Sequence, residues 1–274
     1  MNANKRQCFL PHRMIRVHSC SFAVWLLLAA MVQAAPFVIN SAGNQVNGSA
    51  IKSAPDGTIL LTTLNGQTLT FRKGSYRQAF ADKPPGMFQV EALVKQKKLI
   101  AVVEILRRVK EEYQFLGWDQ RASLMLARVY LPLKQFEDSA REYEALFAAQ
   151  PKFKESPKER SNYMQALLGA GRIAEVAKMI DEDIASGSRE AAARAQVVRG
   201  DMKMKSGQAE EALLDYLRTV ILFKAQTVVL PEATYKTAIA LKKLNDPRAE
   251  QYFQKVINEF PESEFAEKAE GEME

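Results

Sequence analysis

The sequence contains very little cysteine and histidine, with two residues of each among 274. All four lie near the N-terminus, at Cys8, Cys20, His12 and His18. The rest of the chain therefore has no means of forming disulfides, Cys/His zinc sites, thiol nucleophiles or imidazole bases. It also lacks a glycine-rich phosphate loop ending in Lys-Ser/Thr. These absences predict a protein that is not an enzyme and has no metal or other cofactor. A hydrolase using carboxylates stays open as an alternative, although no spacing of acids points to one.

The first 34 residues have the layout of a secretory signal peptide. They contain four basic residues and no acidic one, and an apolar run follows over residues 21–32. Val32 and Ala34 stand at positions −3 and −1 of a cleavage site before Ala35. The run is shorter than the roughly 20 residues that span a membrane. Cys20 precedes the run, which does not suit lipoprotein processing. We predict export to the periplasm with only indirect membrane association; an uncleaved anchor is the alternative.

Little net charge remains once this leader is removed. The whole chain has 38 basic and 32 acidic residues and a net charge of +6. Without the four basic residues of the leader the counts become 34 and 32, which leaves +2. Nucleic-acid binding through a general basic surface is therefore not predicted.

Residues 35–85 show turn and strand signals rather than helical ones. Asn65-Gly66 separates two runs, residues 58–64 and 67–72, that are rich in Thr, Leu and Ile. Asn-Gly tolerates the positive φ angles of a tight hairpin turn. With a further strand near residues 50–54, the pattern predicts a small antiparallel β meander. Because it has few large apolar side chains, we expect it to pack on the first helices rather than form its own core.

From residue 86 to the C-terminus a helical pattern repeats every 36–37 residues. A small or β-branched residue recurs with a bulky residue four places later, which puts both on one helix face. The pairs are Val102/Leu106, Ser139/Tyr143, Val176/Ile180, Ala212/Tyr216 and Ala249/Phe253. Five such pairs at a nearly fixed interval predict stacked helical hairpins, each burying its apolar face on the next.

The predicted helices pair in sequence order and end with a polar cap. The pairs are 87–97 with 99–115, 119–131 with 135–149, 157–169 with 173–186, 190–205 with 208–224, and 231–243 with 247–260. Gly171 and Gly207 occupy turns within their hairpins, and Pro151 and Pro261 end two second helices. A last helix over residues 263–272, rich in glutamate, would close the exposed end.

These residues resemble the tetratricopeptide repeat (TPR). One copy matches at Gly200, Gly207, Ala212 and Tyr216. Another matches at Ala127, Tyr130, Ser139, Tyr143 and Pro151, whereas Arg199 and Lys203 stand where the repeat prefers apolar residues. The resemblance implies a mainly α fold: a TPR-like α-solenoid of about five helical hairpins plus a capping helix, preceded by the β meander.

The end of the last copy adds a narrower resemblance. Residues 260–269, Phe-Pro-Glu-Ser-Glu-Phe-Ala-Glu-Lys-Ala, are similar to the repeat ends of TPR proteins of the bacterial cell envelope. Those proteins include the periplasmic cell-division coordinator associated with Tol–Pal and the lipoprotein of the outer-membrane barrel-assembly machine. The resemblance implies a scaffold in the envelope, in agreement with the predicted leader.

In this repeat class the first helices of the hairpins line a groove that receives peptides or partner helices. Transferring that geometry places seven polar side chains near the groove: Arg121, Arg128, Asn162, Gln165, Arg194, Asp201 and Lys205. We expect a moderately basic groove that accepts an acidic or C-terminal peptide through charge-assisted hydrogen bonds. The alternative is that these are ordinary solvated side chains.

The β meander offers a second basic surface, formed by Lys52, Arg72, Lys73 and Arg77. Its edge could add a strand from a partner or meet an anionic surface, but edge lysines also serve to block strand pairing. Residues 115–118, Phe-Leu-Gly-Trp, join the first two hairpins. We expect Trp118 to be a buried wedge rather than a ligand platform.

The sequence therefore predicts a non-catalytic adaptor in the cell envelope that binds protein or peptide partners. Self-association through the ends of the array stays open. The alternative from another class is a peptidoglycan- or carbohydrate-binding accessory protein that uses the β meander.

Overall fold

The computed structural model describes residues 35–273. The predicted signal peptide, residues 1–34, lies outside the described residues. Six short strands come first and form two three-stranded antiparallel sheets, ordered β2-β1-β6 and β3-β4-β5. The strands are β1 (Phe37–Asn40), β2 (Gln45–Asn47), β3 (Ala50–Ser53), β4 (Ile59–Thr62), β5 (Thr68–Phe71) and β6 (Tyr76–Phe80).

The predicted meander corresponds to the second sheet. Strand β4 pairs with β5 in the register Leu61↔Leu69, on either side of the Asn65-Gly66 turn. Ile59 and Leu61 are fully buried, whereas Leu60 between them is 39% exposed. The first sheet was not predicted, because β2 has only three residues and the other partner of β1 is β6, at the far end of the β region. Strand β6 contains Arg77 and Gln78, which interrupt the apolar alternation.

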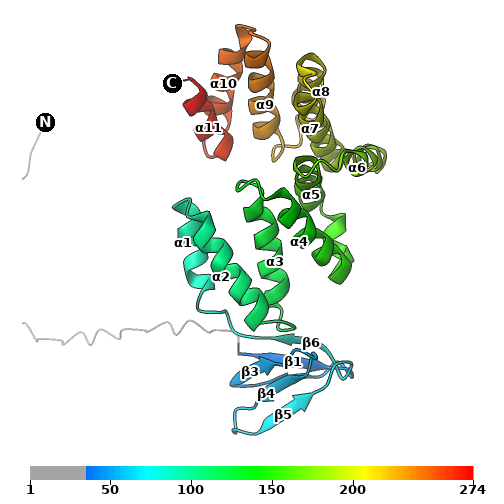
Figure 1. The fold of residues 1–274 in the computed structure, drawn as a ribbon, viewed down its shortest axis with the longest axis vertical. Helices are drawn as coiled ribbons and strands as arrows, with labels where there is room; N and C mark the ends of the chain where they lie inside the picture. Colours follow the sequence, from blue (N-terminus) through cyan, green and yellow to red (C-terminus); the bar gives the residue numbers. More distant parts are fainter. Residues whose placement is uncertain (1–34, 274) are drawn as a thin grey trace, which may run out of the picture. The chain divides into compact units, whose positions relative to one another are not determined.

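Eleven α-helices follow within the described residues, arranged as successive antiparallel pairs (Figure 1). They are α1 (Met87–Lys95), α2 (Leu99–Glu112), α3 (Trp118–Tyr130), α4 (Phe136–Ala149), α5 (Pro157–Gly169), α6 (Ile173–Ala185), α7 (Arg189–Lys205), α8 (Ala209–Leu222), α9 (Leu230–Lys243), α10 (Arg248–Glu259) and α11 (Glu264–Met273). A short 3-10 helix (Pro151–Glu155) precedes α5. The expected five hairpins and capping helix are thus present.

Most predicted helix boundaries differ from the observed ones by one or two residues. The largest difference is at α2, which was predicted to reach residue 115 and ends at Glu112. Phe115 and Gly117 both have positive φ angles, 63° and 78°, which no α-helix accommodates. Serine side chains cap the starts of three described helices, α5, α7 and α11. Ser188, for example, accepts the backbone N–H of Ala191 at 3.2 Å at the start of α7.

Each hairpin turn contains one residue in the left-handed conformation. Gly171 and Gly207 fill this position in the third and fourth hairpins, as predicted. Lys97, Lys134 and Asn245 fill it in the others, with φ angles of 55–58°. The five residues recur every 36–38 residues, close to the interval of the helical pattern, so the turn geometry repeats even where glycine does not.

The ten residues of the repeating pairs are all buried, which confirms the packing expected of them. Neighbouring helices pack in chain order, and α5 also contacts α7 while α9 contacts α11. A polar contact accompanies one of the small positions: the Ser139 hydroxyl donates to the Ala127 carbonyl at 2.6 Å. The small residue therefore allows the two helices of that hairpin to approach closely.

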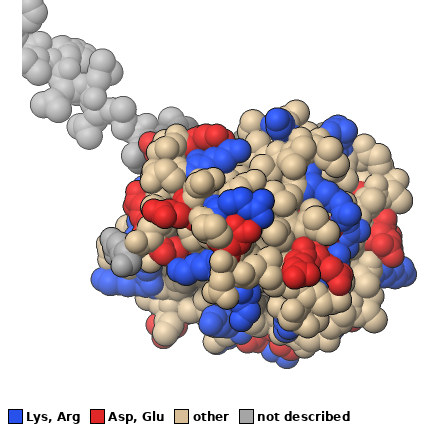
Figure 2. Space-filling model, turned by 90° about the horizontal axis from the view of Figure 1, so that it is seen from above, with Lys and Arg blue, Asp and Glu red and all other residues tan. Residues whose placement is uncertain are grey.

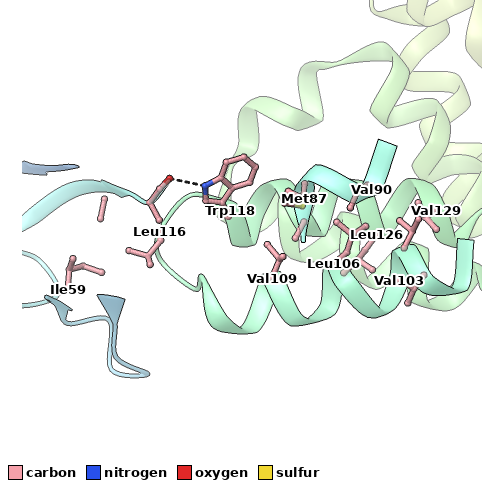
Figure 3. Close-up of a cluster of buried hydrophobic side chains, with 14 of the residues drawn as sticks. Ile59, Met87, Val90, Val103, Leu106, Val109, Leu116, Trp118, Leu126 and Val129 are labelled. Carbon is pink, nitrogen blue, oxygen red and sulfur yellow. Dashed lines mark hydrogen bonds between the residues drawn. The ribbon is translucent and has the colours of Figure 1, made fainter. Parts of the chain in front are cut away.

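The β strands share their core with the first two hairpins. Val38, Ile59 and Leu61 belong to the same buried cluster as Leu106 of α2 and Leu126 of α3. Trp118 is 7% exposed, and its indole N–H donates to the Ala81 carbonyl at 2.9 Å (Figure 3). The expectations that the sheet packs on the first repeat and that Trp118 is a wedge are both confirmed.

None of the helices within residues 35–273 combines the length and the apolar character that crossing a membrane requires.

Candidate partner-binding groove

The first helices of the last three hairpins face a common space. Gln165 of α5 donates to Glu232 of α9 at 3.2 Å, although the two residues are 67 positions apart. Lys236 of α9 lies 2.6 Å from the Asp201 carboxylate of α7. Helices α5, α7 and α9 are therefore brought together by their polar side chains, as the groove-lining position of this repeat class implies.

A hollow of about 390 Å³ opens beside these contacts. We call it the polar hollow; its lining is Phe136, Gln165, Leu168, Gly169, Asp201, Lys205 and Lys236. The ammonium group of Lys205 donates to the Leu168 carbonyl, in the last turn of α5. A cation at a helix C-terminus complements the partial negative charge of the exposed carbonyls. The hollow thus combines three predicted groove residues, Gln165, Asp201 and Lys205.

Two carboxylates neutralise the central cation of this site. Lys236 lies 2.6 Å from both Asp201 and Glu232, and all three side chains are mostly buried. Burial alone would lower the pKa of Lys236, but attraction to the two carboxylates outweighs it and raises the pKa. Burial raises the pKa of Asp201. The Tyr216 hydroxyl donates to Asp201 at 2.9 Å and so fixes this carboxylate from the packed side of α8.

The predicted cations Arg128 and Arg194 also face carboxylates. Arg128 of α3 forms an ion pair with Glu159 of α5, with Nε 3.3 Å from Oε2. The hydrogen bond to Glu159 raises the pKa of the Arg128 guanidinium. Tyr143 donates to the same carboxylate at 3.0 Å, which parallels Tyr216 on Asp201. Arg194 pairs at 2.9 Å with Glu190, one turn earlier on α7.

Arg121 lies apart from the polar hollow, in a second hollow of about 750 Å³. We call this the apolar hollow; its apolar walls are Met87, Val90 and Val94 of α1 and Trp118, Leu124 and Met125 of α3. The Arg121 guanidinium carbon is 4.8 Å from the centre of the Trp118 ring and 5.0 Å from that of Phe80. The arginine therefore lies over aromatic rings rather than beside a carboxylate.

The seven predicted groove residues thus occupy different surroundings. Asn162 is partly buried on α5 and lines neither hollow. Lys236 was not predicted. It follows Asp201 by 35 residues, and Asp201 follows Gln165 by 36, so the repeat interval could have identified Lys236 as a groove residue. Glu159 precedes the predicted Arg194 by 35 residues and so had the same signal, whereas Glu232 had none. Figure 2 shows basic and acidic side chains interspersed over the face drawn there. The affinity of the groove for acidic peptides stays a prediction.

The basic residues predicted on the β region are exposed but do not share one sheet. Lys52 lies on the edge strand β3, and Arg72 and Lys73 follow β5. Arg77 lies on β6, an edge strand of the other sheet. The Lys73 ammonium group is 5.9 Å from the ring of Phe115. Their role in binding a partner stays a prediction.

Comparisons with solved structures show the fold. The structure of a Rap protein complexed with Competence and Sporulation Factor is similar, with a TM-score of 0.51 and 15% identity. The match covers 69% of this chain and 55% of that one, so this chain spans about half the length of the Rap protein. A thermophilic TPR protein from Thermus thermophilus has a TM-score of 0.47 and 16% identity, over 68% of this chain and 96% of that one. No protein-family model and no curated protein matches the chain. The helical part has a TPR fold.

Proposed function

We propose that this protein is a non-catalytic scaffold of the cell envelope that binds protein or peptide partners along the first helices of its hairpins. One observation carries the proposal: α5, α7 and α9 meet around a hollow lined by side chains that donate and accept hydrogen bonds. A peptide backbone has unpaired N–H and C=O groups that such a lining can satisfy.

The fold and the sequence add independent support. The Rap protein, which is similar in fold, was solved as a complex with Competence and Sporulation Factor. Export to the periplasm rests on the signal-peptide layout of residues 1–34. The envelope setting rests on the resemblance of residues 260–269 to TPR proteins of that compartment. The dispersed basic residues of the two β sheets do not favour the carbohydrate-binding alternative.

Site-specific photocrosslinking in the native cell tests the binding function. A photoreactive amino acid would replace Lys205, which lines the polar hollow, and in a matched variant Lys178, an exposed lysine on α6. We expect discrete protein adducts from position 205 and none from position 178. Equal labelling from both positions, or no protein adduct from either, would refute a scaffold acting through this groove.

Fractionation and N-terminal sequencing of the same cells test the location. We expect the protein in the periplasmic fraction with Ala35 as its first residue. Recovery of a chain that begins at Met1 from the cytoplasm would contradict the envelope role while leaving the binding function standing.

A further inference from the structure

The apolar hollow differs from the rest of the groove in the chemistry of its lining. Six of its ten lining residues are apolar, and they come from the first helices of the first two hairpins. Its volume of about 750 Å³ is in the range of ligand-binding pockets, roughly 300–1,000 Å³. Val94 on its wall is 41% exposed, so the hollow presents apolar surface to solvent.

The floor of the hollow is rigid because it is part of the protein core. Val90 is 2% exposed and Met87 8%, and both pack in the cluster that joins the strands to the helices (Figure 3). The indole N–H of Trp118 is already bonded to the Ala81 carbonyl. The Trp118 ring, 7% exposed, is therefore part of the floor and leaves no unsatisfied donor beneath a guest. Met125, which is partly exposed on the wall, has a flexible side chain that adapts to different guests.

The charges around the apolar hollow are mostly positive. The lining contains Lys83, Lys95 and Arg121 against the single carboxylate of Glu91. Lys95 pairs with Glu91 at 3.0 Å. Within residues 35–273, Lys83 and Arg121 form no salt bridge; the Lys83 ammonium group lies 4.4 Å from the Phe88 ring centre instead. These two cations are available to a guest of opposite charge.

We propose that the apolar hollow binds an amphipathic segment of a partner protein, with large apolar side chains seated on Val94, Leu124 and Met125 and flanking aspartate or glutamate beside Lys83 and Arg121. The inference rests on the proposed function, because it assumes that the partners are proteins. It adds the chemistry of the partner segment. Apolar anchors supply most of the binding energy in such grooves, and the charges fix orientation and speed association.

Selection from a random 12-residue peptide library on the purified full chain tests this inference. We expect enriched peptides to contain at least two of Leu, Met, Phe or Trp together with Asp or Glu. Their affinity, measured by fluorescence anisotropy, should fall at least about tenfold in the Val94→Asp variant, which places a like charge and a polar group against the acidic, apolar guest. The matched control is Val228→Asp, since Val228 is exposed and lies outside the hollow.

A charge reversal tests the acidic preference separately. In Lys83→Glu the same peptides should bind several-fold more weakly, and versions with Lys in place of Glu should bind more tightly than to the natural protein. Circular dichroism would confirm that both exposed substitutions leave the fold intact.

Three results would overturn the inference. Peptides whose affinity is the same for Val94→Asp and Val228→Asp bind elsewhere on the protein. If no peptide of this composition is enriched, an amphipathic acidic segment is not the guest of the apolar hollow. A change of oligomeric state in Val94→Asp, seen by sedimentation, would assign the hollow to a second copy of the chain. In each case adducts from position 205 would still support the scaffold function, so the two proposals fail separately.

Discussion

Replacing Asp215 should destabilise the fourth hairpin more than any other single charge removal in it. Asp215 of α8 is fully buried, yet three cations surround its carboxylate. Arg199 reaches it with two nitrogens, at 2.6 and 3.1 Å, and Lys203 lies at 2.9 Å. Arg218, one turn along the helix, completes the set at 2.8 Å. The Asp215→Ala variant would leave these cations without their common partner.

The expected cost follows from burial. Removing one partner of a buried ion pair costs about 3–5 kcal/mol. Arg199 and Lys203 keep 27% and 22% of their side chains exposed, so both regain part of their hydration. We therefore expect a loss of about 2–3 kcal/mol in the free energy of unfolding. With a urea dependence of about 2–3 kcal/mol per molar, the unfolding midpoint should fall by about 1 M.

Urea unfolding followed by circular dichroism measures this loss, and hydrogen exchange in α7 and α8 localises it. The control is Glu211→Ala on the same helix, because Glu211 is half exposed and lies 3.6 Å from Lys203. It should change stability by no more than about 0.5 kcal/mol. A loss below about 1 kcal/mol for Asp215→Ala, or equal losses for the two variants, would refute the assignment of Asp215 as the buried centre of this network.

Three further changes test the turn geometry, the wedge and the buried charge. Gly207→Ala should lower the unfolding free energy by about 1–2 kcal/mol through backbone strain alone, since φ is 81° and nothing lies within 4 Å of the added methyl group. Lys134→Gly, at a residue with φ of 58°, should raise the unfolding free energy by about 0.5–1 kcal/mol. Thermal melts compare the two variants. Trp118→Phe should cost about 2–3 kcal/mol by urea unfolding, because it leaves the Ala81 carbonyl unbonded and a void in the shared core. Burial raises the pKa of Asp215, but hydrogen bonds from Arg199 and Lys203 outweigh burial and lower the pKa. The stabilisation by the Asp215 carboxylate should therefore be complete near neutral pH and fade as the pH falls toward 3. The difference in unfolding free energy between the natural protein and Asp215→Asn should narrow over that range, and a constant difference would contradict the lowered pKa.

The helices could be predicted because their apolar pairs recur at a fixed interval. Val102 with Leu106, or Ala212 with Tyr216, identifies a helix face whatever the neighbouring residues are. The turns were only half predictable: Gly207 marks a left-handed residue, but Lys134 adopts the same conformation without any sequence signal. The first β sheet was missed because β2 has only three residues, polar residues interrupt β6, and β1 pairs with β6 across the whole length of the β region.

The polar residues were harder to predict because their partners lie in other repeats or other helices. Arg199 and Lys203 stand where the repeat prefers apolar residues, and the structure shows why: both pair with Asp215, a buried carboxylate contributed by the next helix. Arg128 was placed near the groove from its repeat position, but its pairing with Glu159 depends on how α4, which packs on both α3 and α5, places these two helices. Repeat position indicates where a side chain lies, whereas its free charge depends on neighbours that only the folded chain brings together.

Whether a cation already has a carboxylate partner decides where an acidic guest can bind without breaking an ion pair. In the polar hollow a guest carboxylate would have to displace Asp201 or Glu232 from Lys236, at contacts of 2.6 Å, or compete with the Leu168 carbonyl for Lys205. At the apolar hollow, Lys83 and Arg121 lie over aromatic rings, and a guest carboxylate can approach both without breaking an existing ion pair. Apolar side chains seated on Val94 would exclude water and strengthen those new contacts. We therefore infer that acidic side chains of a partner bind at the first two hairpins, whereas the polar hollow of the later hairpins contacts backbone groups of the partner.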